Sequence, residues 1–234
     1  MLGEAVLGSI GGAAALMAYG VRAPASTLLG PSIYRGNTRR RSVALTFDDG
    51  PSEGTLTILR VLEEYGVPAT FFQCGANIRR LPDIARLVVS KGHEIGNHTE
   101  THPNFCFQSS RFIDEEFRRA QRTIEEIVDR SPSLMRAPFG VRWFGFRKVQ
   151  QDLNLLGVMW TVIAKDWKLS APAIAMRLER RVRNGAIFCL HDGRELQRSP
   201  DVFATAEALR ILIPSLLKSG FQFETVTGIQ CQKN

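Results

Sequence analysis

Short apolar runs alternate with amphipathic stretches from about residue 41 to the end of the chain. Runs rich in Val, Ile and Phe indicate buried strands, and apolar positions that recur every three to four residues indicate helices. The predicted strands are 43–47, 69–73, 93–96, 134–137, 158–163, 186–190 and 221–226, and the predicted helices are 55–65, 82–91, 114–128, 146–156, 172–183 and 202–219.

These elements make about seven strand–helix units, and no internal repeat or long linker divides them. Strands that alternate with helices favour a parallel sheet, so we expect one α/β domain over 41–234, built as a closed or nearly closed barrel. In a barrel of parallel strands the active site lies at the carboxyl ends of the strands. Reactive side chains are therefore expected directly after the apolar runs.

The first 40 residues form a separate apolar segment and linker. Residues 5–21 carry no charge but are interrupted by glycines, and the stretch falls short of the roughly 20 residues that a membrane-spanning helix needs. Glu4 stands where a signal peptide has basic residues. Three interpretations stay open: a membrane anchor or uncleaved signal, a cleaved signal, or an extra helix packed on the domain. The first two place the protein in the cell envelope or outside the cell, and the first adds membrane association through residues 5–21.

The chain is basic, with a formal net charge of +7 over 234 residues. Nucleic acid, anionic lipid and acidic polymers all attract such a surface. The densest basic cluster, residues 39–41, has no interleaved aromatic residues of the kind that stack on bases, so we expect no nucleic-acid partner. The four cysteines have no zinc-ribbon or redox spacing, and we expect mostly free thiols. The pattern predicts no oligomeric state.

Asp48 and Asp49 end the first predicted strand. Consecutive side chains of a strand point to opposite faces, but a turn at Gly50-Pro51 allows both carboxylates to reach one cavity with different roles. Asp-Gly is also a common turn dipeptide, so the pair alone leaves a purely structural role open.

His98 and His102 are four residues apart, a spacing that puts both imidazoles on one face of a helical turn. Two imidazoles and one carboxylate suit Zn²⁺ or a similar divalent ion, and they leave positions open for water and substrate. His93 lies in an apolar context, and we interpret it as a structural histidine.

Five motifs in order resemble those of the polysaccharide deacetylase family, the NodB homology domain of carbohydrate esterase family 4. They are TFDDG at 46–50, HTETH at 98–102, RAPFG at 136–140, KDW at 165–167 and CLHD at 189–192. The resemblance covers roughly residues 41–228. It implies a distorted (β/α) barrel and a metal-dependent hydrolase that removes N-acetyl groups from N-acetylglucosamine units of a polysaccharide, either chitin oligomers or peptidoglycan.

The resemblance also implies roles for single residues. Asp49, His98 and His102 would bind one divalent ion, with Zn²⁺ expected and Co²⁺ or another divalent ion as the alternative. Asp48 would be the general base that takes a proton from the attacking water, and Arg136 would tether it.

A second group of residues would act on the leaving amine and the acetyl group. His191 would be the general acid, kept charged and oriented by Asp166. The backbone N–H of Phe139 would hold the developing oxyanion, and Trp167 and Leu190 would complete the substrate pocket.

The chain departs from the family pattern at three positions. Phe139 stands where tyrosine is frequent, but only a backbone donor is needed there. Ile163 stands where the family often has a further aspartate, and Cys189 stands where leucine is common two residues before the histidine. None of these changes removes a metal ligand or the base.

Two further interpretations use nearly the same residues. One is an amidase or deformylase that acts on a small or lipid-linked sugar, and the other is a non-catalytic carbohydrate-binding homologue. A polymer-cleaving enzyme needs aromatic side chains beside its site, for which Trp143, Phe144 and Phe146 are the candidates.

Overall fold

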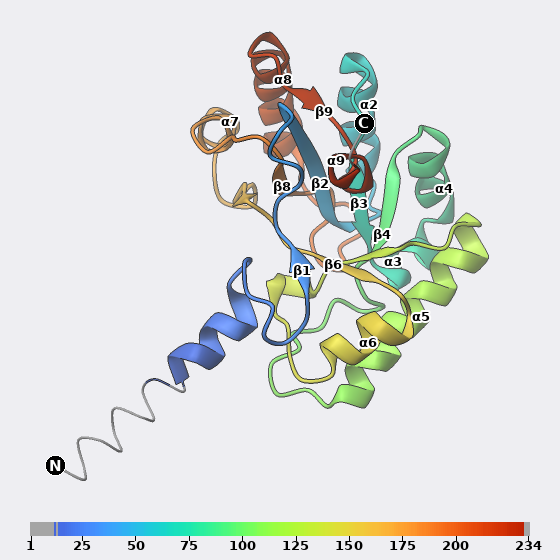
Figure 1. Ribbon diagram of the computed structural model, residues 1–234. Helices are drawn as coiled ribbons and strands as arrows, with labels where there is room; N and C mark the ends of the chain where they lie inside the picture. Colours follow the sequence, from blue (N-terminus) through green and yellow to red (C-terminus); the bar gives the residue numbers. More distant parts are fainter. Residues whose placement is uncertain (1–11, 13, 232–234) are drawn as a thin grey trace, which may run out of the picture.

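One parallel β-sheet organises the computed structural model, which describes residue 12 and residues 14–231 (Figure 1). The strand order is β1-β6-β5-β4-β3-β2-β8-β7, and β9 pairs with the start of β2. The strands are β1 (Ser32–Ile33), β2 (Ser42–Gly50), β3 (Thr70–Gln73), β4 (Glu94–Asn97), β5 (Leu134–Met135), β6 (Leu156–Val158), β7 (Val162–Ile163), β8 (Ala186–His191) and β9 (Gln222–Phe223).

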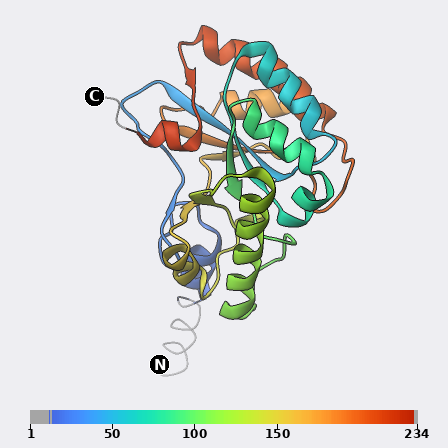
Figure 2. The same ribbon diagram turned by 90° about the vertical axis from the view of Figure 1, so that its right-hand side faces the viewer.

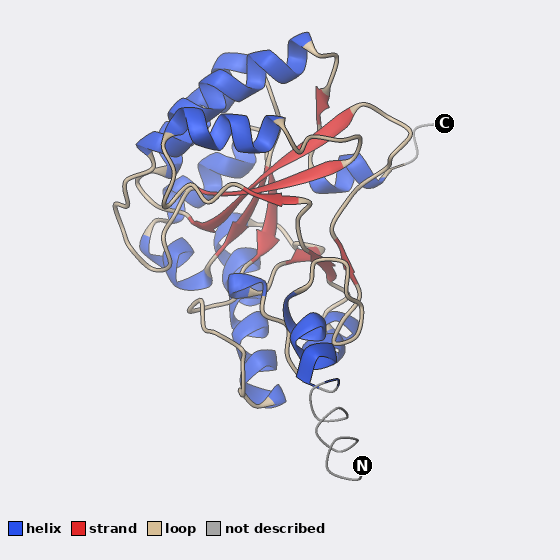
Figure 3. Cartoon of the chain, turned by 90° about the vertical axis from the view of Figure 1, so that its left-hand side faces the viewer, coloured by secondary structure: helices blue, strands red, loops and turns tan. Residues whose placement is uncertain are grey.

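The sheet curves into a distorted half-barrel. The predicted distorted α/β barrel is therefore confirmed, but the barrel is not closed. Among the residues that the structure describes, no strand pairing joins the two outer strands β1 and β7. Figure 3 shows the strands gathered at the centre, with helices around them. Every residue of β2 is buried, because this strand has neighbours on both edges and packed elements on both faces.

The helices cover the sheet through apolar faces. α2, α7 and α8 share one hydrophobic core with β2, β3 and β8, while α5 and α6 pack in a second core. The helices are α2 (Thr55–Tyr65), α3 (Gly75–Arg80), α4 (Pro82–Ser90), α5 (Ser110–Val128), the short 3₁₀ helix η1 (Pro138–Gly140), α6 (Phe146–Asp152), α7 (Ala171–Glu179), α8 (Phe203–Lys218) and α9 (Val226–Gln230).

The end of the N-terminal segment packs on the domain. Residues 14–22 are helical (Figure 2). Val21 and Leu29 are buried in the second core. The guanidinium of Arg142, itself fully buried, donates hydrogen bonds to the carbonyls of Ala23 and Ser26. In the part of the chain that the structure describes, no helix is long and apolar enough to cross a membrane. Residues 5–11 and 13 of the predicted apolar stretch lie outside the described residues.

Several predicted elements are wrong in their boundaries. The single strand expected over 158–163 is two strands: β6 pairs with β5 and β1, and β7 pairs with β8 on the other side of the sheet. Residues 159–161 therefore cross the open side of the half-barrel. The predicted helix 146–156 ends at Asp152, and the predicted strand 221–226 is only β9 followed by the helix α9.

Candidate active site

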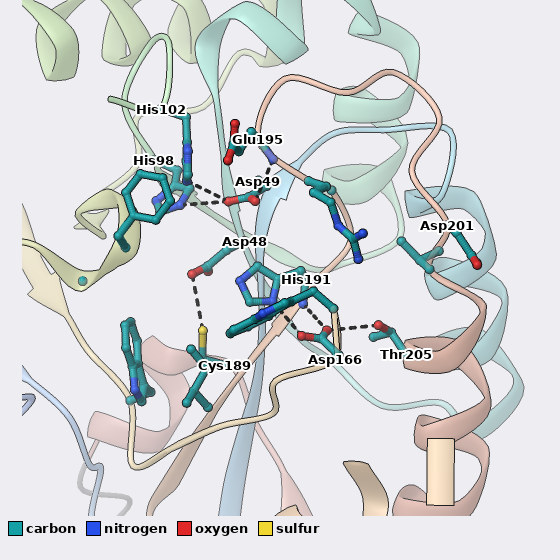
Figure 4. Close-up of a pocket in the computed structure, with 18 of the residues that line it drawn as sticks. Asp48, Asp49, His98, His102, Asp166, Cys189, His191, Glu195, Asp201 and Thr205 are labelled. Carbon is teal, nitrogen blue, oxygen red and sulfur yellow. Dashed lines mark hydrogen bonds and ion pairs between the residues drawn. The ribbon is translucent and has the colours of Figure 1, made fainter. Parts of the chain in front are cut away.

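The reactive side chains meet in one cavity of about 600 Å³ at the carboxyl ends of the strands (Figure 4). β2 and β8 are paired in register, with Asp48 beside His191, so the two strands deliver their last side chains to the same place. Of the ten residues predicted for the site, Asp48, Asp49, His98, His102, Phe139, Asp166, Trp167 and His191 line this cavity.

Asp48 and Asp49 serve different halves of the cavity because the backbone turns between them. Asp49 has a positive φ of 73°, and the ladder between β2 and β3 is irregular between Asp48 and Gly50. Figure 4 shows Asp49 directed at His98 and His102, and Asp48 directed toward Cys189. Both carboxylates therefore reach one cavity, as expected, although the chain already turns at Asp49, before Gly50-Pro51.

Asp49, His98 and His102 form the candidate metal site. Oδ1 of Asp49 lies 3.3 Å from Nε2 of His98 and 3.0 Å from Nε2 of His102. Zinc bonds of about 2.0–2.1 Å at tetrahedral angles put neighbouring ligand atoms about 3.3 Å apart, so the three donors are spaced for such an ion. Nδ1 of His98 is bonded to the carbonyl of Arg136 at 2.8 Å, which leaves Nε2, the atom that faces Asp49, to bind an ion. This donor set fits a divalent metal.

The electrostatics of Asp49 agree with a ligand role. Burial alone raises the pKa of this carboxyl, but hydrogen bonds from His102 and His98 outweigh it and hold the pKa well below its usual range. Its other oxygen, Oδ2, accepts a hydrogen bond from the N–H of Glu195 at 2.8 Å. Asp49 is therefore ionised and fixed in orientation before a cation arrives.

The loop 98–102 is not the helical turn that the histidine spacing suggested. Positive φ angles at Thr99 and His102 turn the chain so that both imidazoles face Asp49. Glu116 of α5, which the sequence reasoning missed, supports this loop. Its carboxylate accepts hydrogen bonds from the N–H groups of Glu100 and Thr101 and from the Thr101 hydroxyl. No motif marks Glu116, because it lies among the many charged residues of that helix.

Arg136 lies behind Asp48, as predicted. Its Nη1 donates to Oδ1 of Asp48 at 2.5 Å and to the Thr46 hydroxyl at 2.8 Å, and its guanidinium covers the ring of Phe72. Carbonyls of Val158 and Met159 accept its remaining hydrogen bonds. A fully buried guanidinium with all these partners has one available position, so it fixes the Asp48 carboxylate.

His191 and Asp166 form a hydrogen-bonded pair on the wall of the cavity. Nδ1 of His191 lies 2.8 Å from Oδ1 of Asp166, and Oδ2 of Asp166 accepts hydrogen bonds from the His191 N–H and the Thr205 hydroxyl. Burial alone lowers the pKa of His191, but the charge and hydrogen bond of Asp166 outweigh burial and raise that pKa to about 9. The imidazole is therefore protonated near neutral pH, as a general acid requires.

Phe139 and Trp167 enclose the ends of the cavity. The Phe139 ring packs edge-on against His102, with ring centroids 4.7 Å apart, and Trp167 packs edge-on against His191. Phe139 has a positive φ of 56°. The N–H groups of Gly140 and Val141 bond to the preceding turn, but the N–H of Phe139 makes no such bond in the part of the chain that the structure describes. It therefore stays free to donate to a substrate.

Two predicted contributions to the substrate pocket are wrong. Leu190 is fully buried in the main hydrophobic core, because side chains alternate along β8 and its neighbours Cys189 and His191 take the cavity face. Phe146 is buried in the second core and offers no surface to a polymer. Trp143 and Phe144 are at least partly exposed, but neither lines the cavity.

The remaining histidine and the cysteines match their predicted roles. His93 is buried, its Nδ1 accepts a hydrogen bond from the Ala69 N–H, and burial lowers its pKa to about 4, so it is a neutral structural residue. All four cysteines lie in the described part of the chain and are free thiols.

Comparisons with known proteins support the reading of the site. Residues 35–158 match the family model described as polysaccharide deacetylase. The chain belongs to the polysaccharide deacetylase family. It is therefore a metal-dependent hydrolase of carbohydrate esterase family 4, with the half-barrel fold of NodB-like proteins.

Individual relatives in this family act on two kinds of polymer by name. The chain is 36% identical to a chitooligosaccharide deacetylase of a Bradyrhizobium strain, over 78% of this chain and 87% of the relative. It is 35% identical to a peptidoglycan-N-acetylglucosamine deacetylase of Bacillus cereus, over 84% of this chain and 70% of the relative. A crystal structure of a peptidoglycan N-acetylglucosamine deacetylase superimposes with a TM-score of 0.79 and 29% identity, covering 84% of this chain and 91% of that one.

Proposed function

We propose that the protein removes acetyl groups from N-acetylglucosamine residues of chitin oligomers or peptidoglycan and releases acetate. The observation that carries this proposal is the arrangement of two carboxylates and three histidines around one cavity, with Arg136 and Asp166 in support. The named substrates of the relatives, chitooligosaccharides and peptidoglycan, both contain N-acetylglucosamine. We further propose that the ion is Zn²⁺, because two imidazoles and one carboxylate at these spacings suit it.

The ion would be held by Asp49, His98 and His102. When bound, it supplies Lewis acidity, which lowers the pKa of water and polarises the acetyl carbonyl. Asp48 would accept the proton of the attacking water, since its Oδ2 faces the cavity while Oδ1 is held by Arg136. Holding this carboxylate in place spares the reaction the cost of orienting a base.

His191 and Asp166 would act on the leaving group, the amine of the sugar. His191, protonated near neutral pH, would donate its proton to the amide nitrogen as the C–N bond breaks. Asp166 would keep the imidazole charged and oriented throughout. The free N–H of Phe139 would donate a hydrogen bond to the oxygen that gains negative charge, a contact that is stronger in the transition state than in the substrate.

The rim of the cavity is mixed in charge. Arg22 and Arg194 line it together with Glu195 and Asp201. Such a rim accommodates neutral chitin oligomers as well as peptidoglycan, whose peptides and muramic acid carry carboxylates. We propose that the protein works in the cell envelope or outside the cell, because both proposed polymers occur there.

Acetate release tests the proposal. Metal-stripped and zinc-restored protein would be incubated with chitin oligomers, peptidoglycan and acetylated xylan, and acetate would be measured. We expect release from chitin oligomers or peptidoglycan only after zinc is restored. Release from xylan alone, or from none of the three in protein that holds one equivalent of zinc, would contradict the proposed substrate.

A further inference from the structure

A second group of side chains that could bind a metal lies beside the candidate metal site. One residue of this group has no role in the proposed reaction. Asp48, Cys189 and His191 each offer a ligand atom, and these atoms all lie within 4.8 Å of one another. Cys189 is the member that neither the base nor the acid function uses. It lines the same cavity, and its thiol points at Asp48 (Figure 4).

The strand pairing explains why these three groups meet. β8 lies parallel to β2, and its alternation directs Cys189 and His191 to the cavity face on either side of the buried Leu190. Because Asp48 is paired with His191 across the two strands, the carboxylate, the thiol and the imidazole converge without a loop having to move. The pairing of β2 with β8 therefore fixes the positions of all three residues.

The distance between the sulfur and the carboxylate oxygen suits a tetrahedral ion. Bonds of about 2.3 Å to sulfur and about 2.0 Å to oxygen, at a tetrahedral angle, put the two ligand atoms about 3.5 Å apart. Sγ of Cys189 lies 3.5 Å from Oδ2 of Asp48. Arg136 holds Oδ1 of Asp48, so Oδ2 is the oxygen that faces the thiol.

The surroundings of His191 also match a metal ligand. Nδ1 is bonded to Asp166, which leaves Nε2 as the coordinating nitrogen in the carboxylate–histidine–metal arrangement common in proteins. A thiolate, an imidazole and a carboxylate form a borderline-soft set, which selects Zn²⁺ or Co²⁺ over Mg²⁺ or Ca²⁺.

We propose that Asp48, Cys189 and His191 bind a second zinc ion, and that this ion inhibits the enzyme. Binding forms bonds from zinc to Sγ, Nε2 and Oδ2, and it releases the thiol proton and the imidazolium proton to solvent. The general base and the general acid are then both occupied. The inhibition rests on the proposed function, but the binding does not.

The second site is weaker than the first. Burial raises the pKa of the Cys189 thiol, and the pKa of His191 lies at about 9, so zinc has to displace two protons near neutral pH. It also binds beside another cation. The site at Asp49, His98 and His102 therefore fills first, and the second fills only when free zinc is in excess.

Cobalt binding separates the two sites without any measure of activity. The first site has no sulfur ligand, so a thiolate-to-cobalt charge-transfer band in the near ultraviolet reports the second site alone. We expect wild-type protein to bind two equivalents of Co²⁺, the band to develop with the second, and Cys189→Ala to bind one equivalent without the band. The matched control is Cys106→Ser with Cys231→Ser, which removes the two thiols outside the buried interior and should keep the band.

Acetate release then tests the consequence. We expect excess zinc to lower the wild-type rate by about a hundredfold or more, since base and acid are both lost. The rate of Cys189→Ala would be compared with its own rate at one equivalent of zinc. This variant should need at least about tenfold more zinc for half-inhibition, because the loss of even a residue that only supports a metal ligand lowers metal affinity by that factor.

A missing cobalt band in wild-type protein that has bound its first equivalent would overturn the second site, whatever the activity. A band without inhibition would overturn the regulatory role only. If no variant released acetate under any condition, the proposed function would fail, yet the cobalt result would still stand.

Discussion

The two adjacent carboxylates have different partners, and the different roles proposed for them rest on those partners. Asp49 turns toward two imidazoles, which hold its pKa low, and Asp48 turns toward a guanidinium and a thiol. A similar division separates the histidines. His98 and His102 present Nε2 to Asp49, whereas His191 has its Nδ1 bonded to a carboxylate and is kept charged. Residue type alone does not assign these roles; the partner of each side chain does.

The charge on His191 makes a prediction about pH. Its pKa of about 9 means that the acid form persists through neutral pH and is lost as pH rises through that value. We expect kcat/KM to fall on the alkaline side near pH 9. Asp166→Asn removes the main interaction that raises the pKa of His191, and burial then dominates. The alkaline limb of the pH profile should therefore move down by at least about two units, toward or below the ordinary histidine pKa of about 6.5. An alkaline limb that stays in place in Asp166→Asn would show that another group is the acid.

At the scale of the element, the N-terminal segment depends on one buried cation. Arg142 ties the carbonyls of Ala23 and Ser26 to the domain, and the segment it holds also brings Arg22 into the cavity wall. A buried guanidinium is tolerated there because two carbonyls accept its hydrogen bonds, and that of Ala23, at the end of the helix, carries partial negative charge.

This contact predicts a large loss of stability. Arg142→Ala removes a charged donor from two carbonyls and leaves that of Ser26 without a partner, since the Ala23 carbonyl still accepts from the Ser26 N–H, so we expect it to lower the free energy of unfolding by about 2–4 kcal/mol. Arg147→Ala is the matched control: Arg147 is exposed and also donates to carbonyls of the segment, at Thr27 and Leu28, and we expect a loss below about 1 kcal/mol. Urea unfolding would measure both; equal losses would mean that Arg142 is not the anchor.

Sequence periodicity predicted the long elements well and the short ones poorly. The helix over 55–65 is found with those bounds because its apolar face is strongly periodic. The strand expected over 158–163 failed, because an apolar run does not reveal that the chain leaves one edge of a sheet and joins the other.

The motifs located the site residues but not their supports. Eight predicted residues line the cavity because each lies at the carboxyl end of a strand or in the loop that follows one. Glu116 and Thr205 could not be found this way, since both are contributed by helices distant in sequence and neither belongs to a motif. The prediction for Leu190 was wrong by one position along β8. A shift of one residue moves a side chain to the other face of a strand, and Leu190 therefore lies in the core.

For the whole molecule, the metal site links separate parts of the sheet. Asp49 lies near the end of β2, and His98 and His102 follow β4, with β3 between these strands. An ion bound by all three residues therefore stabilises the folded chain and not the unfolded one.

Removing the ion should lower the melting temperature. At a free metal concentration of about one hundred times Kd, binding contributes about 2.7 kcal/mol, which corresponds to several degrees for a chain of this size. Calorimetry with and without a chelator measures the shift. At a metal concentration too low to fill the second site, Asp49→Ala should melt at one temperature with and without the chelator, while Asp48→Asn should keep the difference. A chelator-dependent shift that persists in Asp49→Ala would place the ion elsewhere.

The most direct test of the assigned roles is a paired measurement on the two neighbouring carboxylates. Metal content and kcat for acetate release would be determined for Asp48→Asn and Asp49→Asn in the same zinc buffer. We expect Asp48→Asn to retain one equivalent of zinc and to lose at least about a hundredfold in kcat, the usual contribution of a general base. We expect Asp49→Asn to lose the zinc as well as the activity. Near-normal turnover in zinc-loaded Asp48→Asn would contradict the assignment of Asp48 as the base.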